Sequence, residues 1–279
     1  MANVSDSARW VAAYRAVESA RPDAVFRDQY ADRLAGPQGR MIARAAPHSK
    51  RSGWSVVART KVIDDLVMLA LGEGCDRVLN LAAGFDTRPY RLDLPPELVW
   101  IEADLPALLE DKEQLLDGET ARCTVTRYAV DLVDPQARRV FLDAALAGAS
   151  KALVLTEGLV GYLDQSEVVA LSDAFRRPEI AWWTVDIVNP RIVADMVKKS
   201  NAELQRAPFA PIDGVGFFEA RGWRVLEVES VYHAARRLRR LPLTRRLYAY
   251  LPGRRPTPRN PGGRPWMMIA RLSPAGADT

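Results

Sequence analysis

Residues 77–92 read RVLNLAAGFDTRPYRL, and this stretch decides the fold. Its first five residues predict a buried strand, and the three small residues that follow predict a tight turn that a ligand can approach closely. A second apolar strand, Leu98–Glu102, leads to Asp104, 20 residues beyond Gly84. A carboxylate at this spacing can accept hydrogen bonds from ribose hydroxyls of a nucleotide-like cofactor. The turn holds one glycine, so it matches a dinucleotide fingerprint poorly.

Short apolar runs alternate with helical patterns from residue 77 onward. We expect strands at Arg77–Leu81, Leu98–Glu102, Thr124–Ala129, Ala152–Glu157, Trp182–Asp186, Trp223–Ser230 and Trp266–Leu272. We expect helices at Leu105–Leu116, Pro135–Ala147, Gln165–Phe175 and Gly214–Arg221. This alternation predicts a parallel sheet wrapped on both faces, with ligands beyond the carboxyl ends of its strands. The polar residues that close the strands are therefore the candidates to watch: Asp86, Glu102, Asp104, Asp131, Glu157 and Asp186.

The two ends of the chain depart from this alternation. Residues 1–72 are predicted to form a helical cap on a core of residues 73–279, with Ser5 or Asp6 capping the first helix. No helix is expected between Ser230 and Trp266, so the last two strands are predicted to be antiparallel neighbours. A lid insertion is expected near residues 189–213 and a basic hairpin at residues 233–265.

Composition narrows the class of protein. The 279 residues are 48% hydrophobic and 27% charged, as in an ordinary globular protein. The chain has no apolar run of roughly 18 residues and no signal-peptide pattern at its start, so no membrane span is expected. Two cysteines and two histidines are too few for a disulfide framework or a His/Cys zinc cluster. We expect no metal and a reduced, cytoplasmic setting.

Four ordered motifs resemble the leucine carboxyl methyltransferase family. They are Asn80–Arg88 (NLAAGFDTR), Ile101–Pro106 (IEADLP), Val130–Leu132 (VDL) and Leu155–Leu163 (LTEGLVGYL). Ser5–Trp10 with Phe26–Asp28 looks like the bacterial branch, which includes polyketide carboxyl methyltransferases of the tetracenomycin-pathway type. The resemblance covers about residues 5–230. It implies an α/β, Rossmann-like methyltransferase fold with a seven-stranded, mostly parallel sheet, and S-adenosyl-L-methionine as cofactor.

The resemblance also implies roles for matching cofactor residues. Gly84 would contact the methionine part of S-adenosyl-L-methionine, and Ala82 stands where the family usually has glycine. Asp104 would hold the ribose hydroxyls, and Asp131 with Leu132 would contact adenine. Arg59 would pair with the methionine carboxylate, and Glu157 would lie near the amino group and the transferred methyl.

Each of these residues also has a structural interpretation. Asp104 can cap the helix that begins near Leu105, and Asp131 can cap the Pro135 helix or satisfy a turn. Arg59 can face solvent or form an internal salt bridge. Glu102 is expected to be structural. A buried Glu157 needs a charged or hydrogen-bonding partner.

The substrate candidates are less specific. Arg88 can face a substrate carboxylate, or Asp86 and Arg88 can tie the turn to the N-terminal helices by an ion pair. Four further residues are possible pocket residues, although aromatic residues at such places are more often core: Tyr14, Arg15, Tyr162 and Trp183. Neither His48 nor His233 has a partner for a Ser/His/Asp triad.

A methyl ester is the expected product. A carboxylate oxygen is already a nucleophile at neutral pH, so no strong general base is required, whereas phenol methylation usually needs proton removal. In-line placement can supply ~7–11 kcal/mol in favourable cases. The N-terminal helices and the residues after Asp186 would cover the site and exclude water.

An arginine-rich segment leaves a second class of function open. Ten arginines lie between Arg236 and Arg264. Without them the rest of the chain carries a formal net charge of −6, against +4 for the whole. The stretch Arg236–Arg246 could form a short basic amphipathic helix that docks an acidic acyl carrier protein, an anionic membrane surface or nucleic-acid phosphates, or it could form a solvated hairpin. The alternatives to a small-molecule enzyme are a methyltransferase of protein C-termini and a non-catalytic binding module; nucleic acid is the less expected partner.

Overall fold

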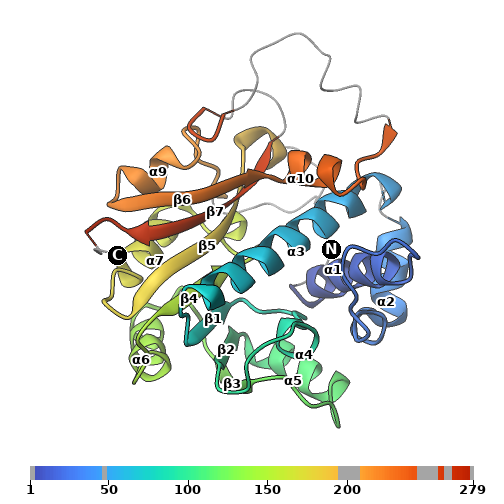
Figure 1. The fold of residues 1–279 in the computed structure, drawn as a ribbon, viewed down its shortest axis with the longest axis horizontal. Helices are drawn as coiled ribbons and strands as arrows, with labels where there is room; N and C mark the ends of the chain where they lie inside the picture. Colours follow the sequence, from blue (N-terminus) through green and yellow to red (C-terminus); the bar gives the residue numbers. More distant parts are fainter. Residues whose placement is uncertain (1–3, 46–48, 194–207, 244–256, 261–265, 277–279) are drawn as a thin grey trace.

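The computed structural model of the chain describes residues 4–45, 49–193, 208–243, 257–260 and 266–276. Seven strands form one open sheet in the order β3-β2-β1-β4-β5-β7-β6 (Figure 1). They are β1 (Arg77–Leu81), β2 (Val99–Asp104), β3 (Thr124–Ala129), β4 (Ala152–Thr156), β5 (Ile180–Val188), β6 (Trp223–Ser230) and β7 (Met267–Pro274). Strand β7 is antiparallel to β5 and β6, and the other pairs are parallel. The predicted fold class is confirmed.

The strand order places a crevice between β1 and β4. From β1 the chain crosses to β2 and β3 on one side of the sheet, and β4 then pairs with β1 on the other side. Connections that diverge in this way leave a crevice at the carboxyl ends of the two central strands. The turn of residues 82–87 follows β1, and Glu157 follows β4, so both motifs lie at this edge.

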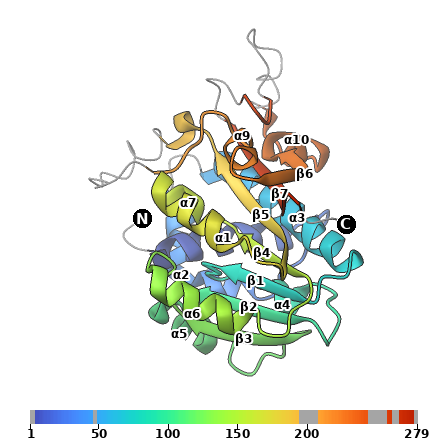
Figure 2. The same cartoon turned by 90° about the vertical axis from the view of Figure 1, so that its left-hand side faces the viewer.

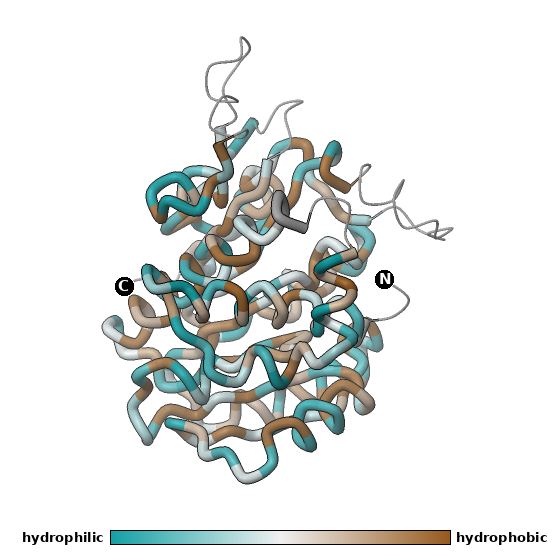
Figure 3. Tube along the Cα trace, turned by 90° about the vertical axis from the view of Figure 1, so that its right-hand side faces the viewer, coloured by the Kyte–Doolittle hydropathy of each residue, from teal (hydrophilic) through white to brown (hydrophobic). Residues whose placement is uncertain are grey.

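Helices cover both faces of the sheet (Figure 2). Helices α3 (Ser49–Gly72) and α10 (Val231–Arg237) pack on one face, and α6 (Pro135–Ala145), α7 (Gln165–Ala174) and α9 (Gly216–Glu219) pack on the other. The strands are apolar on both sides because both sides are covered. Hydrophobic and hydrophilic residues are interspersed along the chain (Figure 3). No described helix is long and apolar enough to span a membrane.

Two further helices form an N-terminal layer. Helix α1 (Val4–Ser19) packs against α2 (Ala31–Ala45), which is kinked at Gly36 before Pro37. Their apolar residues meet Phe85 and Tyr90 of the β1 turn region in one cluster. Helix α3 instead contributes to the core over the sheet. The division of the chain at residue 72 stays a prediction.

Three local predictions are wrong in detail. A helix, α10, follows β6 directly, because residues 231–237 bury Val231, Ala234 and Ala235 against the sheet at helical spacing. Helix α1 already begins at Val4, so Ser5 and Asp6 lie within it rather than capping it. Helix α9 covers only four residues of the expected eight. The predicted antiparallel pairing of the last two strands is confirmed.

The remaining short elements connect the strands at the carboxyl edge. They are α4 (Arg88–Arg91), α5 (Pro106–Leu115) and the 3-10 helix η1 (Val160–Tyr162). The lid insertion expected at 189–213 lies partly outside the described residues. Of its described part, the Asn189 N–H donates to the Trp266 carbonyl, and the Phe209 N–H donates to the Leu163 carbonyl at 2.6 Å. The described ends of this segment are thus fixed beside β7 and η1.

Candidate functional site

The turn after β1 is built for close approach. Ala82 and Gly84 have φ of +53° and +49°, in the left-handed region that disfavours a side chain. The Ala83 N–H donates to the Ala103 carbonyl, and the Gly84 N–H donates to Asp104 Oδ2 at 2.7 Å. A Cβ on Gly84 would lie 3.5 Å from the Ala8 methyl of α1. Helix α1 therefore lies directly over the turn.

Asp104 is a buried carboxylate with two backbone donors. Its Oδ1 accepts from the Leu105 N–H at 2.7 Å, and its Oδ2 accepts from Gly84. The residue is 5% exposed, and burial raises its pKa above the ordinary value despite these bonds. Leu105, not Asp104, is the N-cap of α5. Among the described residues no arginine or lysine forms a salt bridge with Asp104, so its acceptor capacity suits neutral hydroxyl donors.

Arg59 reaches from α3 to the ends of two neighbouring strands. Its Nε lies 2.9 Å from Glu157 Oε1, just beyond β4, and its Nη1 lies 3.0 Å from Asp186 Oδ2 on β5. Burial alone would lower the pKa of Arg59, but Glu157 and Asp186 outweigh it and raise that pKa. The internal salt bridge anticipated from the sequence is present. Within the described part of the chain, Nη2 makes no hydrogen bond.

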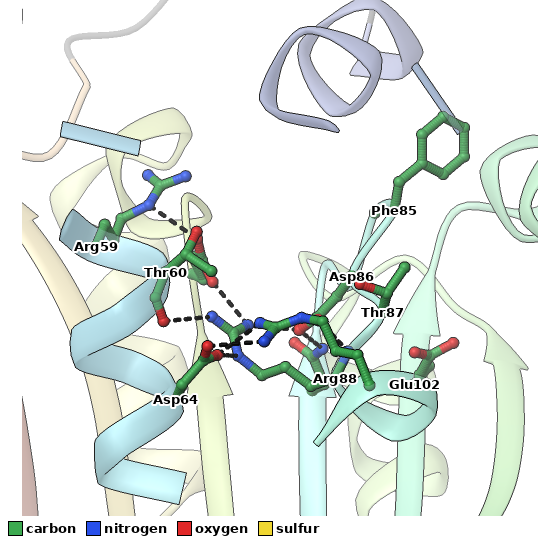
Figure 4. Close-up of polar contacts among 12 residues, drawn as sticks. Arg59, Thr60, Asp64, Phe85, Asp86, Thr87, Arg88 and Glu102 are labelled. Carbon is green, nitrogen blue, oxygen red and sulfur yellow. Dashed lines mark hydrogen bonds and ion pairs between the residues drawn. The ribbon is translucent and has the colours of Figure 1, made fainter. Parts of the chain in front are cut away.

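Arg88 is the centre of a buried ion-pair network (Figure 4). Its Nε donates to Asp64 Oδ1 at 2.8 Å, and its Nη1 donates to Asp86 Oδ2 at 2.6 Å and Glu157 Oε2 at 2.8 Å. Its Nη2 donates to the Thr60 carbonyl, and the residue is 2% exposed. Four of its five donors are therefore used. The structure shows the ion-pair alternative for Arg88, and this geometry leaves little for a substrate.

The network ties the β1 turn to α3. Asp64 accepts from both Arg88 and Arg91, and the Asn80 amide donates to Asp86. Burial alone would raise the pKa of Glu157, but Arg88 and Arg59 outweigh it and hold that pKa below its ordinary value. The same balance lowers the pKa of Asp86, with Arg88 as the main opposing charge. Both carboxylates are thus held ionised.

The ionised groups of this network do not cancel. Three arginines face four carboxylates, so the formal charge of the cluster is −1: Arg59, Arg88 and Arg91 against Asp64, Asp86, Glu157 and Asp186. Unbalanced charge away from water is costly unless a further partner compensates it. Lys112 also acts on Asp86, and burial raises the pKa of Asp186, so the count of −1 covers the salt-bridged groups alone.

The substrate candidates separate into buried and accessible residues. Trp183 is fully buried among Phe175, Phe218 and Trp223, and its Nε1 donates to Thr156 Oγ1, so it belongs to the core. Tyr162, in contrast, is 60% exposed, and its hydroxyl lies 3.1 Å from Ser7 Oγ of α1. This contact joins α1 to η1, the 3-10 helix that follows β4.

Tyr14 and Arg15 lie between layers rather than in the crevice. Arg15 pairs with Asp28 at 2.9 Å and donates from Nη2 to the Phe85 carbonyl, which fixes α1 to the turn. Tyr14 packs its ring against Gly53 of α3, and burial raises its pKa. Both side chains are buried, and the Tyr14 hydroxyl has no hydrogen-bond partner among the described residues.

The region where the sequence predicts adenine contacts differs from the expectation in which residues are exposed. Asp131 Oδ1 accepts from the Val133 N–H at 2.9 Å, which is the anticipated turn; the cap of α6 is Asp134 instead. Leu132 is 8% exposed and belongs to the core. Its neighbour Val133 and the residue after Asp104, Leu105, are 42% and 44% exposed. The apolar surface at this edge therefore comes from Leu105 and Val133.

Several residues of the site were not assigned from the sequence. Glu102 was expected to be structural, and it bridges Lys112 and Arg127. Asp64 was missed, although it lies five residues after Arg59 on a helix whose other face is apolar. Asp186 was noted only as a strand end. An acidic residue in an apolar helix or strand was the available signal for both.

Several arginines of the arginine-rich segment form salt bridges within the chain. Arg240 is bonded to Glu18 and Asp23 of the N-terminal layer, and Arg237 pairs with Glu229. Arg259 pairs with Glu219 of α9 at 2.6 Å. Arg245 and Arg246 lie outside the described residues. Pairs of this kind reduce the charge available to an external partner.

Comparison with solved structures identifies the fold. A DUF574 family protein from Streptomyces avermitilis superposes over 94% of this chain and 96% of its own, with a TM-score of 0.58 and 14% identity. A protein from Thermobifida fusca, provisionally named a methyltransferase, covers 95% of this chain and 94% of its own, with a TM-score of 0.54 and 16% identity. The fold is the Rossmann-like methyltransferase fold.

Sequence comparison then gives the family. The family model for leucine carboxyl methyltransferase matches residues 8–176, and the chain belongs to this family. A relative from Streptomyces coelicolor is 32% identical over 76% of this chain and 80% of its own. A Mycobacterium marinum relative is 36% identical over 58% of this chain, and the match spans only 57% of that relative's length. The names of both provisionally assign them to the S-adenosyl-L-methionine-dependent methyltransferases, in agreement with the cofactor expected from the sequence.

Proposed function

We propose that this protein transfers the methyl group of S-adenosyl-L-methionine to a carboxylate oxygen of a small organic acid. S-adenosyl-L-methionine is the methyl donor, and it supplies an electrophilic methyl on a sulfonium. The observation that carries the choice of acceptor is the state of the three carboxylates that contact Arg59 and Arg88 near the ends of β1, β4 and β5. Asp86 and Glu157 are held ionised by arginines, and Asp186 has both oxygens bonded. A carboxylate acceptor needs no proton removal, so it suits such a site.

The residues of the crevice fit the cofactor part by part. Asp104 would accept from the ribose hydroxyls, and the positive-φ turn at Gly84 leaves room for the methionine chain. Leu105 and Val133 would flank adenine, with Asp131 beside them. Arg59 Nη2 would bind the methionine carboxylate. Leu132 would support this edge from the core rather than touch the base.

The electrostatics also fit. S-adenosyl-L-methionine carries a sulfonium and an ammonium against one carboxylate, a net charge of +1. That charge balances the formal −1 of the buried network around Arg88. Glu157 would face the ammonium group while holding Arg59 and Arg88. An anionic acceptor is then attracted to the sulfonium itself, and placement in line with the methyl supplies the remaining advantage.

Helix α1 and the described ends of residues 189–213 would cover the reacting atoms. Ser7 and Tyr162 meet across the crevice, and Ala8 lies over Gly84. Such a cover removes water from the acceptor oxygen. Tyr162 would contact the acceptor, because it is the exposed aromatic residue at this place. The product would be a methyl ester of a polyketide-like or related secondary metabolite, made in the cytoplasm, and the tetracenomycin-type branch stays the expected one.

The test is chemical. The protein is incubated with S-adenosyl-L-methionine labelled on the methyl group and a panel of aromatic and polyketide-type acids, each paired with its primary amide. A methyl ester releases volatile labelled methanol in mild base, and the amides should give none. Label that stays with the product after base treatment would refute carboxyl methylation and indicate an ether, amine or carbon acceptor.

A second candidate is the C-terminal carboxylate of a protein. The description of the family, leucine carboxyl methyltransferase, favours it. A peptide that ends in leucine, compared with the same peptide as its C-terminal amide, separates the two candidates in the same assay. Labelling of the free peptide alone would replace the small-molecule proposal. A non-catalytic module is less favoured, because the acidic residues that suit the cofactor are present and Arg237, Arg240 and Arg259 are paired internally.

A further inference from the structure

We propose that Asp186 is a positioning residue for the amino-acid end of the cofactor, acting through Arg59 and the backbone of Gly158. This inference rests on the proposed function and extends it to a residue that does not itself touch the ligand. It concerns binding rather than the methyl transfer.

Asp186 holds two neighbours at once. Its Oδ2 accepts from Arg59 Nη1 at 3.0 Å, and its Oδ1 accepts from the Gly158 N–H at 2.8 Å. The residue is 6% exposed, so neither oxygen is free for a ligand. Burial raises the pKa of Asp186, and Arg59 and the Gly158 N–H oppose that rise. The carboxylate is therefore a structural link between α3, β5 and the turn after β4.

This link fixes the direction of Arg59. A guanidinium group is a planar fork, so anchoring two of its nitrogens determines where the third points. Asp186 on β5 accepts a hydrogen bond from Nη1, and Glu157, just beyond the adjacent strand β4, lies 2.9 Å from Nε as an ion pair. Figure 4 shows this guanidinium group directed away from Asp64 on the same helix. The donor that remains, Nη2, can then form a charge-assisted hydrogen bond with a ligand carboxylate.

Gly158 is part of the same arrangement. Its φ is +72°, and a Cβ at this position would lie 3.7 Å and 4.0 Å from the two terminal nitrogens of Arg59. Glycine thus allows the left-handed turn, and the guanidinium group lies within van der Waals distance of it. Since Asp186 bonds to both partners, it sets their separation. Arg59 and Gly158 would together recognise the carboxylate of an α-amino acid beyond the carboxyl end of β4.

The experiment compares two ligands on the full-length protein by calorimetry. S-adenosylhomocysteine has the amino-acid end, whereas methylthioadenosine keeps the adenosine and the sulfur but lacks it. In Asp186→Asn the amide retains one acceptor oxygen for Gly158 but cannot offer a second, charged acceptor to Arg59. We expect the Kd for S-adenosylhomocysteine to rise about tenfold to hundredfold, and that for methylthioadenosine to stay within about twofold.

A remote variant serves as the control. Glu227→Gln removes a carboxylate that pairs with an arginine far from the crevice, Arg271, and should leave the ratio of the two Kd values unchanged. Equal weakening of both ligands by Asp186→Asn would show a merely structural role and overturn the inference. If Asp186→Asn does not fold, Arg59→Gln must show the same selective loss, and an unchanged ratio in that variant overturns the inference. Wild-type protein that binds neither ligand would contradict the proposed function as well.

Discussion

The conformation of Ala82 leads to a prediction in which a smaller side chain stabilises the protein. With φ of +53°, Ala82 is held in the left-handed region, which costs an L-residue about 1–2 kcal/mol. Glycine avoids this cost but gains freedom in the unfolded chain, worth about 0.5–1 kcal/mol. Ala82→Gly should therefore raise the free energy of unfolding by about 0.5–1 kcal/mol, and Tm by roughly 1–4 °C.

Its neighbour is a matched control. Ala83 is 6% exposed and does not have a positive φ. Ala83→Gly adds the same unfolded-state freedom and loses a buried methyl, so it should lower stability by about 1–2 kcal/mol. Urea unfolding of both variants, compared at equal m-value, measures the difference. Equal destabilisation by both variants would refute the strain assigned to Ala82.

Two further predictions concern buried charges. Arg271 is 2% exposed and pairs with Glu73 and Glu227, which are both partly exposed. Urea unfolding should show that Arg271→Met lowers the free energy of unfolding by about 1–3 kcal/mol. The exposed Arg237→Met should lower it by less than about 1 kcal/mol. Burial alone would raise the pKa of Asp28, but Arg15 and Thr87 outweigh it and hold that pKa below the ordinary 3.8. The stabilisation that ionised Asp28 gives the folded protein is fully present above pH 3.8 and is lost as pH falls through the lower folded pKa. Asp28→Asn should therefore flatten the decline of Tm below pH 3.8. An unchanged slope would contradict this.

The sheet could be predicted from the sequence because its signals are local. Continuous apolar runs bounded by polar residues located every strand within two residues of its observed bounds. Helix α10 was missed because its apolar signal is short. It consists of three buried residues at helical spacing, Val231, Ala234 and Ala235, followed by arginines. A run of arginines in the same segment does not by itself indicate an external partner. Arg240 forms a salt bridge with Glu18, more than 200 residues earlier in the chain.

The site was predictable in its motifs but not in its connections. Gly84 and Asp104 were linked by spacing alone, and a hydrogen bond of 2.7 Å joins them. The partners of Arg88 could not be read from the sequence, because Asp64 and Glu157 come from elements far apart in the chain. Likewise, periodicity did not separate buried Leu132 from exposed Val133. Long-range ion pairs depend on the fold, which local patterns do not specify.

Asp104 is the residue through which the proposed cofactor site would hold the ribose hydroxyls. Calorimetric titration of S-adenosylhomocysteine into wild-type protein and Asp104→Asn tests this role, with Asp131→Asn, at an exposed turn, as the comparison. Loss of a charged acceptor for the ribose hydroxyls should weaken binding about hundredfold in Asp104→Asn, and only slightly in Asp131→Asn. Binding of equal strength in wild type and a folded Asp104→Asn variant would contradict the account.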